Sequence, residues 1–473
     1  MQKQNTLEEE YFLEITNLFS KLLGINNLIF RGPNGASTYP VSGLTGENYI
    51  ETQRNIVLIN SMKNLVNVHF NEYMSLKNTL DKKHLLQKIT DEFIYGTILF
   101  PQDTEKNELL NNNNLLVEGI SNFFGFLQDL AVKTYEQRVC TASFIVSKLK
   151  NSVKIMPKIL NDWGLDFFPV ENGQIEYEAI YDYSKAYRLV DSLSLSYVTD
   201  ENFKIIGLAR KRKDYSSIKE TFFNYCPDEI DFVYLENKSI NWINSKDVLL
   251  HFQNGQWKIK DYEMINGIVQ YCLTQSKCEE IRAYIYKFVE VFKSLSQENI
   301  GSLFVFIDEA CSQKHNPAIN GDEYIPYDLE YLLERLLNNT KNENLEIVQL
   351  FKQVIADCRA ITEIDKYLLK LIASVDGAVI VDNKLNIVDY GRMIKTQELN
   401  EQFKNFYLPV NPSAPSTSEG YKAYDLENPP ECNVNGGARS LAACNASTFG
   451  TAVKISEDGG IDIYYHRILV YSI

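Results

Sequence analysis

The 473-residue chain lacks the features that would commit it to a membrane or to a nucleic acid. No run of apolar residues approaches the roughly 18 that cross a bilayer, and residues 1–24 read as an acidic amphipathic helix rather than a signal peptide. Lysine and arginine number 47 against 62 aspartates and glutamates, so the formal net charge is −15. Proteins that hold nucleic-acid phosphates or an anionic membrane surface usually carry a basic excess. The sequence therefore predicts neither partner.

Cysteine occurs eight times, but in no pattern that binds a metal or exchanges disulfides. No two cysteines form a Cys-x-x-Cys pair, and no histidine lies at zinc-ligand spacing from one. The eight are scattered along the chain: Cys140, Cys226, Cys272, Cys278, Cys311, Cys358, Cys432 and Cys444. We expect reduced thiols that act as small core fillers, and hence a protein of the reducing cytoplasm.

Several catalytic and phosphate-binding signatures are also missing. There is no His-Glu-x-x-His of a metalloprotease and no Gly-x-Ser-x-Gly nucleophile elbow. The segment RGPNGASTYPVSGLTGE, residues 31–47, lacks the Gly-Lys-Ser/Thr ending of a P-loop, so it is predicted to be a surface loop. The basic run ARKRK, residues 209–213, follows a strand-like stretch and is predicted to be a solvated strand end.

The chain does have the composition of a globular protein with more than one domain. Its hydrophobic fraction is 45%, and at roughly 100–200 residues per domain its length predicts two or three. Helical patterns dominate the first part, and short strands alternate with short helices in the second. We predict a mainly helical region at 1–139, an α/β sensor-like module at 140–274 and a further domain at 275–473. The fold class is therefore α/β, with an α+β N-terminal region.

The stretch SVDGAVIVD, residues 374–382, is the first candidate site. Asp-Gly usually marks a hairpin turn between two strands, but the preceding ITEIDKYLLKLIAS has apolar residues at helical spacing. Asp376 therefore lies where a helix ends and a buried strand begins. Such an aspartate is either a capping or turn residue, or a carboxylate that faces a ligand or a hard cation such as Mg²⁺ or Mn²⁺.

A second candidate is GGARSLAACNAS, residues 436–447, where two glycines open a short helix. Backbone N–H groups at the positive end of a helix dipole bind anions, and Arg439 adds a fork suited to phosphate oxygens. The alternative is a helix that packs closely on a sheet, because Gly and Ala permit the approach. A third piece, SEDGG at 456–460, taken alone predicts a hairpin turn.

Together these pieces resemble the diadenylate cyclase domain family. The matching segments are GSLFVFIDE, LLKLIASVDGAVIVDNKLNIVDYG, NGGARSLAACNAS and FGTAVKISEDGGIDIY. The family carries Asp-Gly-Ala at a strand start, Gly-Thr-Arg-His-Arg at a later helix start and a Ser-Glu-acid turn before its last strands. Order and approximate spacing agree over residues 275–473. The resemblance implies a central mixed β-sheet flanked by helices.

The resemblance also implies a reaction. Two facing domains hold two ATP molecules head to head, each 3′-hydroxyl attacks the α-phosphate of the other ATP, and two pyrophosphates leave. The product is cyclic di-AMP, a second messenger, and the enzyme is a metal-dependent nucleotidyltransferase that needs Mg²⁺ or Mn²⁺. Such transfer depends on positioning and charge neutralisation. A homodimer or larger even oligomer follows, with residues 1–274 as a regulatory or sensor region.

The resemblance assigns roles to ten residues. The catalytic residues are Asp376, Arg439 and Glu457, and Asp376 would also hold the metal and help to activate the 3′-hydroxyl. Gly377 and Ala378 would let the nucleotide approach the strand, and Met393 would contact adenine. The phosphate cradle would consist of Gly437, Ala438, Arg439 and Ser440, and Ser456 would lie beside Glu457 on the triphosphate or metal side.

The helix motif departs from the family pattern. Ala438 replaces the threonine, Ser440 the histidine and Leu441 the second arginine, so Arg439 alone survives. A missing charge-assisted contact costs about 1.5–3 kcal/mol. Either nearby basic groups replace the lost ones, with Arg392, Lys395 and Lys454 as candidates, or the domain binds ATP or a cyclic dinucleotide as a sensor without cyclising it.

Overall fold

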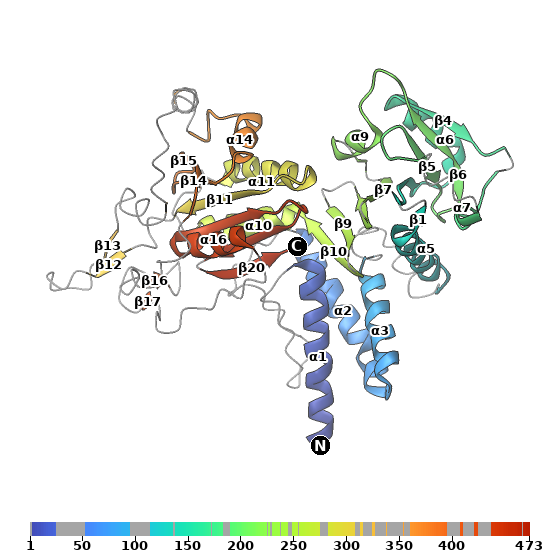
Figure 1. The fold of residues 1–473 in the computed structure, drawn as a ribbon. Coiled ribbons are helices and arrows are strands. Elements are labelled where there is room, and N and C mark those ends of the chain that lie inside the picture. The colour runs from blue at the N-terminus through green and yellow to red at the C-terminus, as the bar shows by residue number, and fades with distance from the viewer. Residues whose placement is uncertain are drawn as a thin grey trace. The chain divides into compact units, whose positions relative to one another are not determined.

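The computed structural model divides the chain into two compact units, with the boundary between Asp261 and Tyr262. Unit 1 contains the described residues up to Asp261, and unit 2 contains those from Tyr262 onward (Figure 1). The structure describes residues 2–24, 53–94, 114–135, 138–171, 173–182, 190–224, 226–227, 229–236, 238–244, 248–253, 255–274, 282–307, 313–315, 324–326, 337, 353, 360–394, 407–409, 421–423, 437–465 and 467–473. Helices and mixed sheets occur in both units, which confirms the predicted α/β class.

Unit 1 combines helices with one eight-stranded sheet. The helices are α1 (Gln2–Leu23), α2 (Gln53–Ser75), α3 (Thr79–Phe93), α5 (Asn114–Val132), α6 (Ser152–Asp162), α7 (Ala179–Asp182) and α9 (Ile218–Asn224). The strands of the sheet, in spatial order, are β10 (Gln256–Asp261), β9 (Val248–Gln253), β8 (Ser239–Ile243), β7 (Ile230–Glu236), β3 (Ala142–Ser147), β5 (Leu195–Thr199), β6 (Ile205–Lys211) and β4 (Leu165–Pro169). Only β3 and β5 are parallel neighbours in this sheet. A separate hairpin pairs β1 (Thr134–Tyr135) with β2 (Arg138–Val139).

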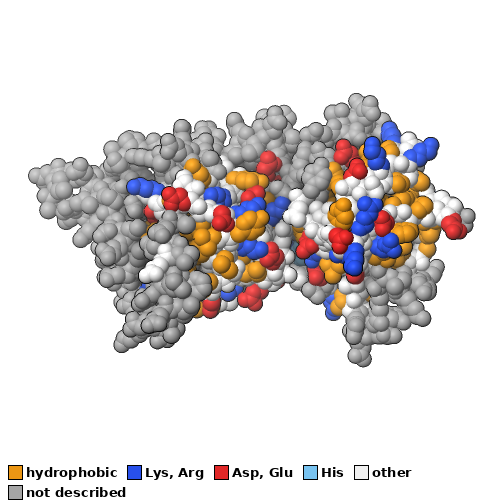
Figure 2. Space-filling model, turned by 90° about the horizontal axis from the view of Figure 1, so that it is seen from above, with side chains coloured by type: hydrophobic (Ala, Val, Ile, Leu, Met, Phe, Trp, Pro, Cys, Tyr) orange, Lys and Arg blue, Asp and Glu red, His pale blue; other side chains and the backbone are white. Residues whose placement is uncertain are grey.

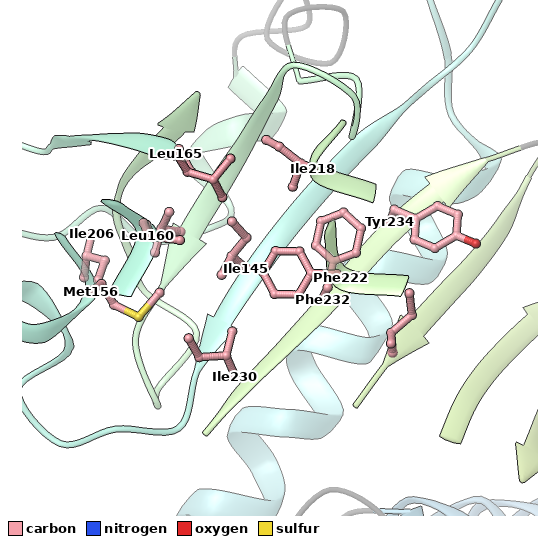
Figure 3. Close-up of a cluster of buried hydrophobic side chains, with 13 residues drawn as sticks. Ile145, Met156, Leu160, Leu165, Ile206, Ile218, Phe222, Ile230, Phe232 and Tyr234 are labelled. Atoms are coloured by element: carbon pink, nitrogen blue, oxygen red, sulfur yellow. The ribbon is translucent and has the colours of Figure 1, made fainter. Parts of the chain in front are cut away.

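Both faces of this sheet are covered, because alternate residues of a strand point to opposite faces. On one face Ile145 joins Met156 and Leu160 of α6 in an aliphatic and aromatic core (Figure 3). On the other face Phe144 meets Phe123 of α5, with ring centroids 5.6 Å apart. Continuous apolar runs such as ASFIVS and IDFVYL therefore read as strands buried on both sides.

The basic run lies where β6 ends. Arg210 and Arg212 both bind Asp166 of the edge strand β4, at 3.0 and 2.9 Å. The side chain of Arg210 is 56% exposed, as predicted for a solvated strand end. Basic and acidic side chains are interspersed on the face drawn in Figure 2, which is the pattern of an ordinary solvated surface.

Unit 2 is built on a six-stranded mixed sheet. Its helices are α10 (Tyr262–Thr274), α11 (Arg282–Gln297), α14 (Lys366–Ala373), α16 (Ala438–Ala446) and the 3₁₀ turn η4 (Ser447–Phe449). The strands, in spatial order, are β15 (Ile387–Arg392), β14 (Ala378–Val381), β11 (Ser302–Ile307), β18 (Gly450–Ile455), β19 (Ile461–Tyr465) and β20 (Ile468–Ser472). Two further pairs are β12 (Gln313–His315) with β13 (Tyr324–Pro326), and β16 (Tyr407–Pro409) with β17 (Tyr421–Ala423).

The central strand β11 separates two cores. Phe304 packs against Phe288 and Phe292 of α11 on one face, with ring centroids 6.1 and 4.9 Å apart. On the other face Leu303 joins the cluster that contains Ala443 of α16. Helices therefore flank a central mixed sheet, with β11 parallel to β14 and the other pairs antiparallel.

The structure draws the unit boundaries differently from the prediction. Helix α10 packs against α11 and β18, so unit 2 begins at Tyr262 rather than at residue 275. The helices predicted as a separate region at 1–139 belong with the following sheet, because α1 packs on β10 and α5 packs on β7 and β8. An amphipathic helix needs an apolar surface to cover, and the sequence does not say which sheet supplies it.

The helices and the cysteines bear on two predictions, that the chain does not span a membrane and that its thiols are reduced. Within the described part of the chain, none of the helices combines the length and the apolar composition that a membrane span requires. Cys140, Cys226 and Cys272 are free cysteines, as predicted. Cys444, which is fully buried in unit 2, is disulfide-bonded, so the expectation of a reduced thiol does not hold for this residue.

A buried polar cluster joins the helices of unit 1. The ring nitrogens of His69 (α2) lie 3.1 Å from Glu72 and 2.7 Å from Glu92. Burial lowers the pKa of His69, but the hydrogen bonds and charges of the two glutamates outweigh it and raise the pKa above its usual value. Beside it, Asp91 (α3) accepts hydrogen bonds from Gln87 at 2.9 Å and from Ser121 (α5) at 3.2 Å. Burial raises the pKa of Asp91 to about 6, although the two hydrogen bonds oppose the shift.

We predict that Asp91→Asn makes unit 1 more stable at pH 7.5, by up to about 3 kcal/mol. The unfolded carboxyl ionises near 3.8 and the folded one near 6, so the free energy of unfolding falls as pH rises between these values and stays low above them. Asparagine removes the buried charge; its Oδ1 can still accept from Gln87, and its Nδ2 can donate to the Ser121 hydroxyl. Denaturant titrations from pH 4 to 8, followed by tryptophan fluorescence, measure this, because Trp163, Trp242 and Trp257, the only three tryptophans, all lie in unit 1. Exposed Asp162→Asn is the control, and an Asp91→Asn protein with the wild-type pH profile would contradict the prediction.

Candidate functional site

Most of the predicted site residues lie at one end of the unit 2 sheet. Ala378 of β14 pairs with Leu303 of β11, and Leu303 pairs with Lys454 of β18. Because β14 is parallel and β18 antiparallel to β11, the first residues of β14 and β11 and the last residues of β18 lie at the same end of the sheet. We call this end of the sheet the site end. Arg392 pairs with Ala378, so Met393 follows β15 at the same end.

Asp376 is an exposed acid at the site end, and it does not cap the preceding helix. The N-terminus of helix α14 is capped by Asp365, whose side chain accepts hydrogen bonds from the backbone N–H groups of Tyr367 and Leu368 at 2.8 and 2.9 Å, and the C-cap residue is Ser374. The helix ends at Ala373, and a short bend then carries the chain into β14. Within the described residues the carboxylate of Asp376 has no hydrogen bond or ion pair. A carboxylate without an internal partner is open to a cation or a ligand.

The structure explains why residue 377 is a glycine, and the explanation differs from the one that the resemblance implies. Its φ of +115° lies in a region that favours glycine. A Cβ at this position would lie 2.7 Å from the backbone nitrogen of Arg392 and 2.9 Å from the Cα of Gly391, and closer still to the Gly391 carbonyl carbon. The glycine therefore makes room for the neighbouring strand β15. Ala378 is 1% exposed and its side chain packs in the core between the sheet and α16.

Helix α16 brings Arg439 to the site end. Gly437 is the N-cap residue and provides no side-chain cap, and a Cβ on it would meet nothing within 4 Å. The guanidinium Nη1 of Arg439 lies 3.4 Å from a carboxylate oxygen of Glu457, in the turn after β18. The two side chains are 34% and 76% exposed, so this ion pair is weak and a ligand could displace it. Ala438, the first residue of α16, stands beside them.

Ser440 does not reach the position that the resemblance gives it. It is 2% exposed and its side chain hydrogen-bonds Tyr464 of β19. Burial raises the pKa of the Tyr464 hydroxyl to about 12, with a smaller contribution from the charge of Asp462, and the Ser440 bond acts in the opposite direction. The Ser440 hydroxyl is therefore part of the core. Of the predicted cradle, the Arg439 side chain and the backbone at the helix start remain for a phosphate.

The segment SEDGG forms the hairpin turn between β18 and β19. The backbone N–H of Ser456 donates to the Gly460 carbonyl at 2.9 Å, and that of Gly459 donates to the Ser456 carbonyl at 2.9 Å. The Ser456 hydroxyl also donates to the Gly460 carbonyl, at 3.2 Å. The turn thus occupies Ser456 and presents Glu457 to solvent.

The candidate replacements for the lost basic groups are already paired. Lys454 lies 2.7 Å from Asp462, its cross-strand partner, and the two side chains are only 14% and 16% exposed. Arg392 lies 3.3 Å from Asp389. The third candidate, Lys395, lies outside the described residues. Arg439 is therefore the motif cation that the structure presents at the site end.

The residues at the site end are compatible with a divalent cation that is bound together with a nucleotide. Among the described residues, no group of three or more His, Cys, Asp or Glu side chains could hold a metal by itself. Mg²⁺, however, is usually bound by one or two carboxylates together with substrate phosphates. The open carboxylate of Asp376 fits that mode, and it requires a nucleotide to complete the coordination.

The sequence interpretation missed Gly301, which precedes β11. The sequence assigns this residue no role beyond its place at the start of the segment GSLFVFIDE. In the structure the side chains of Arg439 and Glu457 lie over this glycine. No pattern in the sequence links position 301 to 439, because the contact depends on how α16 packs against β11.

Comparison with known proteins adds no relative. No protein-family model matches the chain, and no curated protein matches it either. The resemblance to diadenylate cyclase domains therefore rests on the sequence motifs.

Gly377→Ala should lower the free energy of unfolding of unit 2 by about 2 kcal/mol or more, because the new methyl group would meet backbone atoms of β15 in a strained conformation. Gly437→Ala is the matched control, since its Cβ meets nothing and its φ is −68°. Denaturant titrations followed by circular dichroism compare the two. If Gly377→Ala were as stable as the control, room for a ligand rather than for β15 would explain this glycine.

Proposed function

We propose that unit 2 is a nucleotide-binding domain that condenses two ATP into cyclic di-AMP and two pyrophosphates. The observation that carries the proposal is the convergence at the site end of an open carboxylate, Asp376, and the motif cation, Arg439. They come from different elements: Asp376 precedes β14, which pairs with β11 from Leu303 onward, and Arg439 of α16 lies over Gly301 just before β11. An acid for a metal and an arginine for phosphate oxygens are the groups that phosphoryl transfer requires.

Each residue would act by holding or orienting the nucleotide. Arg439 would donate hydrogen bonds to phosphate oxygens from the N–H groups that its weak pair with Glu457 leaves open. Asp376 would hold Mg²⁺ or Mn²⁺, which when bound neutralises the charge of the triphosphate. Met393, which is 45% exposed at the same end, offers an apolar surface to adenine.

The reaction itself is a displacement at phosphorus. The 3′-oxygen of one ATP forms a bond to the α-phosphorus of the other, the bond to the pyrophosphate oxygen breaks, and the proton of the 3′-hydroxyl is released. One site holds one ATP, so two copies of unit 2 must face each other. We therefore propose a homodimer or larger even oligomer, in the cytoplasm, with unit 1 as the regulatory part.

The second candidate is a sensor that binds ATP or cyclic di-AMP without synthesis. A specific observation favours it: Ser440, which replaces the family histidine, is buried in the core, and Lys454 is occupied by Asp462. With only Arg439 on the phosphates, a bound triphosphate would be held too weakly for rapid transfer.

The first test is incubation of the full chain with ATP and Mg²⁺ or Mn²⁺, with products identified by mass spectrometry. We expect cyclic di-AMP and pyrophosphate from the wild type, no product from Asp376→Asn, and full activity from Glu363→Gln, which removes an exposed charge of unit 2 away from the site end. Equal activity of Asp376→Asn would remove that residue from the mechanism. Binding of ATP or cyclic di-AMP by the wild type without any product would establish the sensor.

A further inference from the structure

We propose that Gly301 is a positioning residue of the nucleotide site: the absence of a side chain at 301 seats the Arg439 guanidinium against the end of β11, where it meets a nucleotide phosphate. This inference rests on the proposed function and adds a residue to it. It concerns the phosphate-binding step, which the cyclase and the sensor share. The ligand class is therefore a nucleoside phosphate in either case.

The geometry around Gly301 carries the inference. A Cβ at this position would lie 3.0 Å from the Cζ of Arg439 and 3.0 Å from the Cγ of Glu457, and closer still to Arg439 Nη1. Contacts this short leave no room for a methyl group, so even alanine would displace the guanidinium. The guanidinium thus covers the glycine together with the Glu457 side chain, whose carboxylate lies 3.4 Å from Arg439 Nη1.

The seated guanidinium retains donors for a ligand. An arginine has five N–H donors and accepts nothing. Within the described part of unit 2, Glu457 is the single partner of Arg439, and it engages one nitrogen. The remaining donors can make the paired contact with phosphate oxygens that favours arginine at such sites.

The register of the sheet brings Gly301 and Asp376 to the same end of the sheet. Leu303 pairs with Ala378 in a parallel ladder and with Lys454 in an antiparallel one. Gly301 and Asp376 each precede these paired residues by two positions, so both lie at the site end, just outside the ladders. A cation over Gly301 and an acid at 376 therefore share the end of the sheet at which the proposed nucleotide phosphate and its metal would bind.

Gly301 is not needed for the backbone itself. Its φ lies outside the left-handed range in which only glycine is comfortable. The atoms that a new methyl group would meet are the Arg439 guanidinium and the Glu457 Cγ, which belong to two flexible, partly exposed side chains that can move aside. Substitution should therefore cost little stability and should act on the position of Arg439.

The test measures ATP affinity of the full chain by calorimetry, in the presence of Mg²⁺, for four proteins: wild type, Gly301→Ala, Arg439→Lys and the double variant. We expect Gly301→Ala to weaken ATP binding about ten-fold or more, because a charge-assisted contact is lost, while the thermal midpoint changes little. In the Arg439→Lys background, which lacks the guanidinium, the same alanine should have almost no further effect. This coupling is a readout that a merely structural glycine would not produce.

Gly125→Ala, which adds a methyl group in open space on α5 of unit 1, controls for a glycine substitution that meets nothing. Wild-type affinity in Gly301→Ala, or an equal loss in both backgrounds, would overturn the positioning role and leave the proposed function standing. Absence of ATP, cyclic di-AMP and tripolyphosphate binding by the wild type would overturn both. If Gly301→Ala alone failed to fold, Gly301→Ala/Arg439→Ala should restore folding, and failure of that pair as well would show that the glycine serves the backbone.

Discussion

The pairing of β11 with its two neighbours is the constraint on which the structure of unit 2 depends. This strand is buried on both faces and is parallel to β14 but antiparallel to β18. A slip of one residue in either register would turn every side chain of the slipped strand to the opposite face, and Leu303 and Phe304 would exchange cores. The registers that satisfy both cores also set Asp376, Gly301 and Glu457 at the same edge. Packing therefore determines the site geometry.

Two glycines at the site end are explained by the close approach of neighbouring atoms, but the approaching atoms differ. Gly377 adopts a positive φ and yields space to backbone atoms of β15. Gly301 has an ordinary backbone and yields space to the side chain of Arg439. Backbone atoms cannot move aside, whereas a guanidinium can. The first glycine therefore acts on stability and the second on the position of a charge.

Charge pairing sets the chemical limits of the site. Lys454 is matched by Asp462 and Arg392 by Asp389, so these cations stabilise strands rather than bind a ligand. Among the residues of unit 2 that the structure describes, Arg439 is held by the exposed Glu457 alone. If the proposed function holds, a site with one loosely held cation and one open acid would need a metal, and a facing copy, for much of its charge neutralisation. How much of the phosphate charge is neutralised would decide between a slow synthase and a sensor that binds nucleotide without synthesis.

The sequence by itself determined the α/β class, the position of Asp376 between a helix and a strand, and the turn at 456–460, because local periodicity and turn chemistry are written in neighbouring residues. It did not show that Ser440 would be buried against Tyr464, that Lys454 would be neutralised, or that Gly377 faces β15, because each depends on a strand or helix distant in the chain. The sequence did not predict the unit boundary at Tyr262 for the same reason, because α10 belongs to unit 2 through its packing against α11 and β18. Only the tertiary structure decided that Arg439 lies over Gly301, because that contact exists only once α16 has packed against β11.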